Sequence, residues 1–235
     1  MNEKKRVQRI DSEFRFSADA PEYDSLIEKV SPYYNTLIEE TIRAIPFDKD
    51  KKLNALEIGI GTGRVTEKFI EKYKNAHITG VDISEEMINV AKKKFSNRKN
   101  AFSFLIQKIE DLNLKENYDC IYSCLALHHL KDEKLKFQCY KKIFDALDDG
   151  GFFANGDLIA GENEEENFFF RENYKMFLKK NLEREEEVEF WMRRHLENDY
   201  PAPLTKHLEL LNKAGFRKVQ VYWKKMNYAV FGAVK

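Results

Sequence analysis

The sequence predicts an α/β protein built on a doubly wound, mostly parallel sheet of seven strands. Strand-like apolar segments alternate with helical patterns over 53–157, and such alternation is typical of parallel sheets that helices cover on both faces. The first strand runs into alternating glycines at 59–63, which open a helical pattern. Two more strand-like segments, 218–223 and 228–234, close the chain and complete the seven.

The N-terminal part of the chain precedes this alternation. Residues 1–20 are polar and irregular, and a helical pattern follows over 22–45. Pro32 interrupts this pattern and Pro46 stops it, because proline has no backbone N–H to donate within a helix. We therefore predict an N-terminal helical segment over 1–50.

The core elements follow in order, each with its own start or stop signal. Ser84 supplies a hydroxyl N-cap for the second core helix, and the acidic pair 85–86 favours the helix dipole. The turn at 149–151 ends the last core helix and leads into the last core strand. The expected strands are 53–58, 77–82, 102–107, 118–124 and 151–157, and the expected helices are 63–74, 84–96 and 132–147.

After the fifth strand the alternation gives way to a charged helical stretch. This stretch, 161–203, carries aromatic clusters at 168–170 and 190–191. A helical pattern over 204–215 then leads into the two closing strands. We predict a single domain of 235 residues, with a helical insertion at 161–203 and a closing helix and strands at 204–235.

The glycine turn, which reads E-x-G-x-G-x-G over 57–63, predicts a nucleotide-binding site. Alternate glycines remove the Cβ atoms where the chain turns sharply, and they let a ligand approach free N–H groups at a helix N-terminus. A dinucleotide fingerprint would need glycine where Arg64 stands, so NAD is disfavoured. Asp82 ends the next strand, where a carboxylate can bind ribose hydroxyls.

Together, the glycine turn and Asp82 resemble the first two motifs of the class I S-adenosylmethionine (SAM)-dependent methyltransferases, which have a Rossmann-like fold. The resemblance covers most of the chain. It implies that SAM is the cofactor and S-adenosylhomocysteine the product. It also implies a cofactor-binding core at 51–160, an antiparallel C-terminal strand, and a substrate-covering cap at 161–203.

The resemblance further implies roles in cofactor binding. Glu57 is expected to order the turn or to contact the methionine amino group through water, and Asp82 to bind the ribose diol. Where family members often carry an aspartate for adenine, this chain has Lys108, which cannot accept a hydrogen bond, so the Ile109 amide and the acidic residues 110–111 are expected there. The expected cofactor-binding residues are Glu57, Gly59, Gly61, Thr62, Gly63, Asp82, Ile83, Met87, Ile109, Glu110, Ser123, Cys124 and Leu125, with Ile83 and Met87 flanking the adenine.

The segment 118–130 resembles the D-x-V-x-S-x-x-x-x-H-H-L stretch of small-molecule methyltransferases. His128 or His129 is therefore a candidate base that accepts a proton from the acceptor, although paired histidines also cap helices or pack. Asp157, at the end of the fifth strand, is a further catalytic candidate or a hinge for the cap. Aromatic residues before the sheet and in the cap are candidates for lining an acceptor pocket or for core packing: Phe16, Tyr23, Tyr33, Tyr34 and those between Phe168 and Trp191.

Three alternatives remain. The start of the chain and the stretch R-x-x-L-E-N at 193–198 resemble carboxy-SAM synthases of tRNA modification, in which Arg193 would neutralise a substrate carboxylate. The glycine turn departs from the G-C-S-x-G of those synthases, which would also bind prephenate. A dehydrogenase would bind NADH, and a SAM sensor would bind SAM without turnover.

Composition limits the partners. Lys plus Arg and Asp plus Glu each number 40, so no net charge attracts nucleic acid or a membrane. With no run of about 20 apolar residues and no signal-like N-terminus, we expect a cytoplasmic protein without a membrane span. The three cysteines lack metal-ligand spacing, so no metal is expected. We expect a small-molecule acceptor, no nucleic acid, and a monomer or homodimer.

Overall fold

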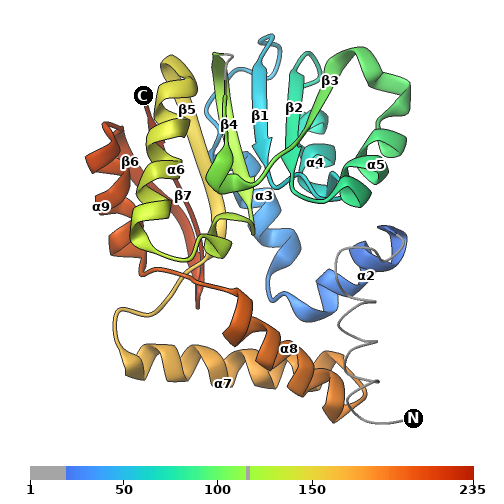
Figure 1. The fold of residues 1–235 in the computed structure, drawn as a ribbon, viewed down its shortest axis with the longest axis vertical. Coiled ribbons are helices and arrows are strands. Elements are labelled where there is room, and N and C mark those ends of the chain that lie inside the picture. The colour runs from blue at the N-terminus through green and yellow to red at the C-terminus, as the bar shows by residue number, and fades with distance from the viewer. Residues whose placement is uncertain (1–19, 115–116) are drawn as a thin grey trace.

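The seven strands form one sheet in the order β3-β2-β1-β4-β5-β7-β6 (Figure 1). The structure, a computed structural model, describes residues 20–114 and 117–235, with the backbone alone for 20–23 and 99–100. The first five strands run parallel, whereas β7 is antiparallel to both β5 and β6. The strands are β1 (Asn54–Ile58), β2 (His77–Asp82), β3 (Phe102–Ile106), β4 (Tyr118–Cys124), β5 (Leu147–Leu158), β6 (Arg217–Lys225) and β7 (Tyr228–Val234).

This topology confirms the predicted Rossmann-like, doubly wound sheet and its antiparallel C-terminal strand. The chain winds outward from β1 to β3 and then returns to place β4 on the other side of β1. Ligands of such sheets bind beyond the carboxyl ends of the strands where the direction of winding reverses, here between β1 and β4. The helices are α2 (Ala20–Val30), α3 (Tyr34–Ala44), α4 (Arg64–Lys72), α5 (Glu85–Lys94), α6 (Glu133–Ala146), α7 (Glu164–Asn181), α8 (Glu185–Asn198) and α9 (Leu204–Ala214), with 3₁₀ turns η1 (Ser96–Ala101), η2 (Ile109–Asp111) and η3 (Leu127–His129).

Two hydrophobic clusters hold the helices on the sheet. On one face, Leu37 of α3 and Phe69 of α4 belong to a cluster that includes Tyr122 of β4, and the rings of Phe69 and Tyr122 stack at 4.6 Å. On the other face, Tyr140 of α6 packs against Phe153 of β5. The central strands are thus buried on both faces, which is why most of their residues are apolar.

A third, smaller cluster lies outside the sheet. Val30 of α2, Leu178 of α7 and Val188 of α8 are its fully buried members. Figure 1 shows α7 and α8 lying side by side across one end of the sheet, with α2 next to them. We refer to α2, α7 and α8 as the cap layer. None of the helices in the described part of the chain is both long enough and apolar enough to cross a membrane.

The structure differs from the prediction in one element of the core. Strand β5 begins at Leu147 and not at residue 151, so the predicted turn at 149–151 lies inside the strand. Gly150 has φ of 78°, and the pairing with β4 shifts register between Tyr118 and Cys120. The glycine pair therefore marks an irregularity in a paired strand, which glycine in a strand often does.

Candidate functional site

The glycine turn connects β1 to α4 with all three of its glycines in the left-handed region. The φ angles of Gly59, Gly61 and Gly63 are 76°, 53° and 84°. A Cβ on Gly59 would lie 2.5 Å from the Cβ of Ala126, and a Cβ on Gly63 would lie 2.5 Å from the ring of Phe95. A Cβ on Gly61 would meet nothing within 4 Å. Two glycines thus permit close packing, and Gly61 turns bare backbone toward open space.

Asp82, at the carboxyl end of β2, is fixed by two backbone amides. Its Oδ2 accepts a hydrogen bond from Gly61 N at 2.8 Å, and its Oδ1 accepts one from Ser84 N at 2.9 Å. Burial raises the pKa of this carboxyl, although these amides act against the rise. Each carboxylate oxygen has a further lone pair, so Asp82 can accept two more hydrogen bonds beside the glycine turn.

Glu57 lies one strand away and is fully buried. Its carboxyl bonds to the hydroxyl of Thr66, whereas its Oε1 has no hydrogen-bond partner among the described residues. Burial raises the pKa of Glu57 to about 8. An unpaired buried polar atom costs free energy, so a cationic partner at this carboxyl would be stabilising.

Two apolar side chains are exposed at the carboxyl ends of β2 and β3. Ile83 is 58% exposed and Ile106 is 51% exposed. Such exposed apolar groups at the ligand-binding edge form suitable walls for a flat base. The sequence predicted Ile83 for this role but not Ile106; the position of Ile106 at the end of a parallel strand was the available signal. Met87, the other proposed wall, is buried.

The remaining cofactor candidates lie in buried strand ends and turns. The Ser123 hydroxyl donates to Ile58 O at 3.0 Å, which ties β4 to β1. Cys124 is buried, and Leu125 has φ of 53° while its amide donates to Gly156 O. Ile109 and Glu110 lie in η2, where Ile109 is half-buried and the Glu110 side chain is exposed.

Polar contacts fasten α2 to the glycine turn. The Thr62 hydroxyl donates to Asp24 Oδ1 at 2.7 Å, so this side chain is occupied by the N-terminal helix. Arg64 pairs with Glu28 at 2.5 Å, and Lys94 approaches Asp24 at 3.4 Å. Helix α2 and the glycine turn can therefore separate only if these contacts break.

A cluster of imidazoles and carboxylates joins the cap layer to the sheet. His128 Nδ1 lies 2.6 Å from Asp157 Oδ1, and its Nε2 lies 3.6 Å from Asp199 Oδ1. His129 Nδ1 lies 3.6 Å from the same oxygen of Asp199, and His195 Nδ1 lies 2.7 Å from the other. Asp199 follows α8, whereas Asp157 lies near the end of β5, so the cluster spans two layers.

The charges in this cluster distinguish the two candidate bases. Burial alone would lower the pKa of His128, but Asp157 and Asp199 outweigh it and raise this pKa to about 10. Burial and the neighbouring His128 lower the pKa of His129. At neutral pH His128 is a cation between two carboxylates, which leaves His129 as the neutral imidazole able to accept a proton. Asp157 is buried and bonded to His128, so it orients that ring.

Donor atoms from His128, His129 and Asp199 lie within 4.8 Å of one another, which is a spacing that can hold a metal ion. Charge pairing of protonated His128 with the two carboxylates accounts for the same contacts without a metal. The three cysteines are buried and free.

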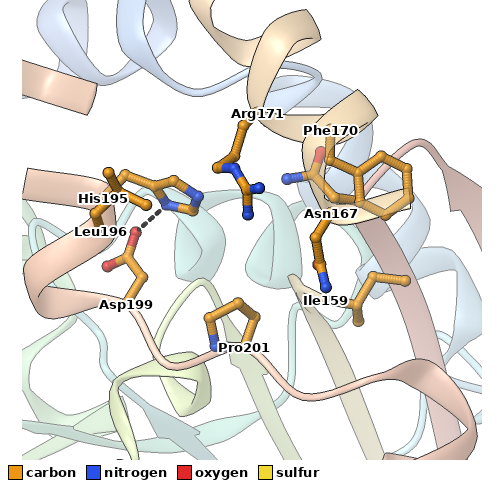
Figure 2. A pocket seen from close by; sticks show the side chains of 9 residues that line it. Ile159, Asn167, Phe170, Arg171, His195, Leu196, Asp199 and Pro201 are labelled. Carbon is orange, nitrogen blue, oxygen red and sulfur yellow. Dashed lines mark hydrogen bonds and ion pairs between the residues drawn. The ribbon is translucent and has the colours of Figure 1, made fainter. Parts of the chain in front are cut away.

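A cavity of about 120 Å³ opens beside this cluster, between the cap layer and the ends of β5 and β7 (Figure 2). Arg171 of α7 points into it, facing His195 and Asp199 at the end of α8. Arg171 was not among the residues predicted from the sequence, although Asn167 and Arg171 are four residues apart and so share one helix face. The lining residues are Ile159, Asn167, Phe170, Arg171, His195, Leu196, Asp199, Pro201 and Asn227.

The substrate candidates from the sequence lie elsewhere. Arg193 is exposed, with its guanidinium carbon 6.0 Å from the centre of the Phe190 ring, and it does not line the cavity. Tyr33 packs edge-on against Trp223 and Tyr228. The side chain of Tyr23, like Phe16, falls outside the described residues. Of the three consecutive phenylalanines, only Phe170 lines the cavity, whereas Phe168 and Phe169 are exposed.

Known proteins match this chain over the region that contains the glycine turn. A family profile described as a methyltransferase domain matches residues 55–151, which span the glycine turn, Asp82 and strand β4. The match places a methyltransferase domain over the glycine turn, where the sequence resembles the class I SAM-dependent methyltransferases. SAM is the cofactor, which agrees with the E-x-G-x-G-x-G spacing of the turn and not with a dinucleotide fingerprint.

Curated relatives of the chain fall into two groups. A carboxy-S-adenosyl-L-methionine synthase of Nautilia profundicola is 27% identical over 96% of each chain. A malonyl-[acyl-carrier protein] O-methyltransferase of Ilyobacter polytropus is 32% identical over 68% of this chain and 54% of its own length. The chain thus spans nearly all of the first relative and about half of the second.

Solved methyltransferases share the fold at low identity. A SAM-dependent methyltransferase from Mesorhizobium loti superposes with a TM-score of 0.60 at 16% identity, covering 85% of this chain and 98% of that one. Human N-acetylserotonin methyltransferase superposes with a TM-score of 0.58 at 18% identity, covering 90% of this chain and 54% of that one. These similarities confirm the predicted fold class.

Proposed function

We propose that the chain transfers the sulfonium methyl of SAM to a small-molecule acceptor and leaves S-adenosylhomocysteine. The observation that carries this proposal is the pairing of Gly61 with Asp82. Gly61 turns bare backbone to open space, and Asp82 is locked beside it with one lone pair free on each oxygen. A ligand with an amino-acid end and a ribose fits that combination.

The residues present fit SAM at both ends. Asp82 would bind the ribose diol, and the open face of Gly61 would admit the methionine moiety. The carboxyl of Glu57, with its unpartnered Oε1, would accept from the ammonium group. Ile83 and Ile106 would flank the adenine, and the amide of Ile109 is the proposed donor to the base.

When bound, SAM supplies an activated methyl group for in-line displacement, in which the C–S electron pair stays on sulfur. Positive charge disperses along this path, so the protein contributes chiefly by aligning the reactants and excluding water. The neutral imidazole of His129 would accept the proton that the acceptor loses, with His128 and Asp157 as positioning residues. Arg171 and the cavity would hold the acceptor under the cap layer.

A carboxy-SAM synthase-like activity is the second candidate. It is favoured by the match to synthases over nearly the whole length of both chains. Against it stand the glycine turn and the position of Arg193, which is exposed on α8 outside the cavity. The two functions share the SAM site and differ in the second reactant.

The first experiment is calorimetric titration of the purified protein with SAM and, separately, with NADH, together with native mass spectrometry for a co-purified ligand. Micromolar SAM binding without NADH binding supports the proposal, and tighter NADH binding overturns it. Turnover is then measured as S-adenosylhomocysteine release in a panel of small acceptors. Prephenate is tested separately. If carboxy-SAM forms in its presence, the synthase function replaces the proposed methyl transfer.

A further inference from the structure

The cavity under the cap layer contains a cation without a close partner. Arg171 points into it from α7 (Figure 2). Its one ion pair in the described part of the chain is with Glu164, at 4.0 Å, and the Glu164 side chain is 91% exposed. Such a long and solvated pair contributes little free energy. The guanidinium is therefore available to a ligand in the cavity.

Amide and imidazole groups surround the same space. Asn167 Oδ1 accepts a hydrogen bond from Gly161 N at 2.8 Å, which fixes the amide and leaves its NH₂ group to donate. His195 uses Nδ1 for Asp199 and keeps Nε2 for another partner. Asn227, from the turn between β6 and β7, adds a second amide to the lining. Donors from three separate segments thus converge with Arg171.

The one carboxylate in the lining, Asp199, is already balanced. One of its oxygens bonds to His195 at 2.7 Å, and the other lies 3.6 Å from both His128 and His129. Because His128 is cationic between Asp157 and Asp199, the negative charge of Asp199 is compensated from the side of the sheet. Asp199 therefore does not compensate the positive charge of Arg171.

The size and the remaining lining limit the ligand further. A volume of about 120 Å³ suits a small ligand group. Ile159, Phe170, Leu196 and Pro201 supply apolar surface around this space. A carboxylate on a short carbon chain fits this mixture of donors and apolar walls.

We infer that this cavity is a carboxylate-binding subsite, in which Arg171 and Asn167 hold an acceptor that carries a carboxylate group. The inference rests on the proposed function, because it specifies the acceptor of that reaction. Arg171 presents a planar fork of N–H donors that can bind a carboxylate through two hydrogen bonds. The acceptor would enter with its carboxylate toward α7 and its other end toward the cofactor.

The test is binding of malonate to the whole protein saturated with S-adenosylhomocysteine, measured by ligand-detected NMR titration, with the neutral isostere malonamide as comparison. We expect malonate to bind and malonamide not to bind. We expect R171Q to weaken malonate binding at least tenfold, with R171K recovering less than half of the loss because lysine lacks the fork. The matched control is R184Q, which removes an exposed arginine of the same cap layer and should leave malonate affinity unchanged.

The outcomes separate this inference from the proposed function. SAM affinity is measured on the same variants and should not change in R171Q. If SAM binds normally but malonate binding is absent, or is unaltered by R171Q, the subsite is refuted while the methyltransferase stands. Loss of malonate binding in R193Q but not in R171Q would place the carboxylate at the exposed arginine and overturn the inference. Inorganic phosphate binding more tightly than malonate would also overturn it.

Discussion

The substitution Asp82→Asn tests the cofactor site most directly. It preserves the shape of the side chain while removing its charge and replacing one acceptor oxygen by an NH₂ donor. The two amides that fix Asp82 lie at 2.8 and 2.9 Å, so one lone pair of each oxygen is left for the ribose diol. A hydrogen bond to a charged group contributes about 1.5–3 kcal/mol, against about 0.5–1.5 kcal/mol for a neutral one.

Two such bonds set the expected magnitude. Their weakening predicts a loss of about 1–3 kcal/mol in SAM binding, which is a rise in Kd of about 5- to 150-fold. Isothermal titration with SAM measures this loss. Thermal unfolding of the ligand-free variant is recorded alongside, because the new NH₂ group also faces an amide donor, either of Gly61 or of Ser84.

Asp119→Asn is the matched control. Asp119 lies near the amino end of β4, where it also accepts from a backbone amide, Asn54 N at 2.9 Å, and pairs with Lys51 at 2.7 Å. Asp119→Asn therefore loses similar structural contacts, but away from the proposed SAM site. Unchanged SAM affinity in Asp82→Asn, or equal weakening in Asp119→Asn, would refute the assignment of Asp82 to the ribose.

Three further predictions concern the glycine turn and the buried charges. Gly61→Ala should lower SAM affinity at least tenfold and should cost about 1–2 kcal/mol of folding free energy, because the backbone of Gly61 is left-handed. Gly59→Ala should lower the melting temperature more, because the new Cβ would lie 2.5 Å from the Cβ of Ala126. Calorimetry measures the SAM affinity of each variant, and melting curves measure its stability. Burial raises the pKa of Glu57 in the folded state from 4.5 to about 8, so the ligand-free protein should lose stability as pH rises from about 4.5 to 8. Denaturant titrations at several pH values measure this slope, and Glu57→Gln should flatten it. An unchanged slope would contradict the raised pKa of Glu57. His128→Asn should lower the free energy of unfolding by about 3–5 kcal/mol, because it leaves the charge of Asp157 buried and uncompensated. Since the pKa of His128 in the folded state is about 10, its stabilisation is complete below pH 6.5 and is lost as pH rises to 10. If the variant kept the wild-type dependence of stability on pH, His128 would not carry this charge.

The fold could be predicted almost entirely because its signals are local. The boundaries of β2 and β4 agree with the prediction, and Pro32 separates α2 from α3 as expected. Strand β5 was predicted to begin four residues too late. Its glycine pair has the local chemistry of a turn, and only the pairing with β4 decides that it lies in a strand.

The cofactor half of the site could be proposed from sequence because its motif is contiguous. The three glycines lie within five residues, and strand order brings Asp82, which follows Gly61 by 21 residues, beside them. The acceptor half depends on how α7 and α8 pack, which no local pattern specifies. Arg193 and Arg171 are both arginines in helical stretches, and only the packing shows that Arg171 faces the cavity. The assignment of single residues to SAM or acceptor stays a prediction, as does the division of the domain into four segments.

The small hydrophobic cluster of the cap layer has a consequence for access to the site. Only Val30, Leu178 and Val188 are fully buried in it, whereas the two clusters on the sheet are far larger. Regions with few buried apolar contacts open at a lower free energy than the core of the same domain. Among the described layers, the cap layer should therefore open at a lower free energy than the sheet, which would let an acceptor enter and a product leave while the sheet stays folded. Because Thr62 and Arg64 fasten α2 to the glycine turn, the same opening also frees the cofactor edge.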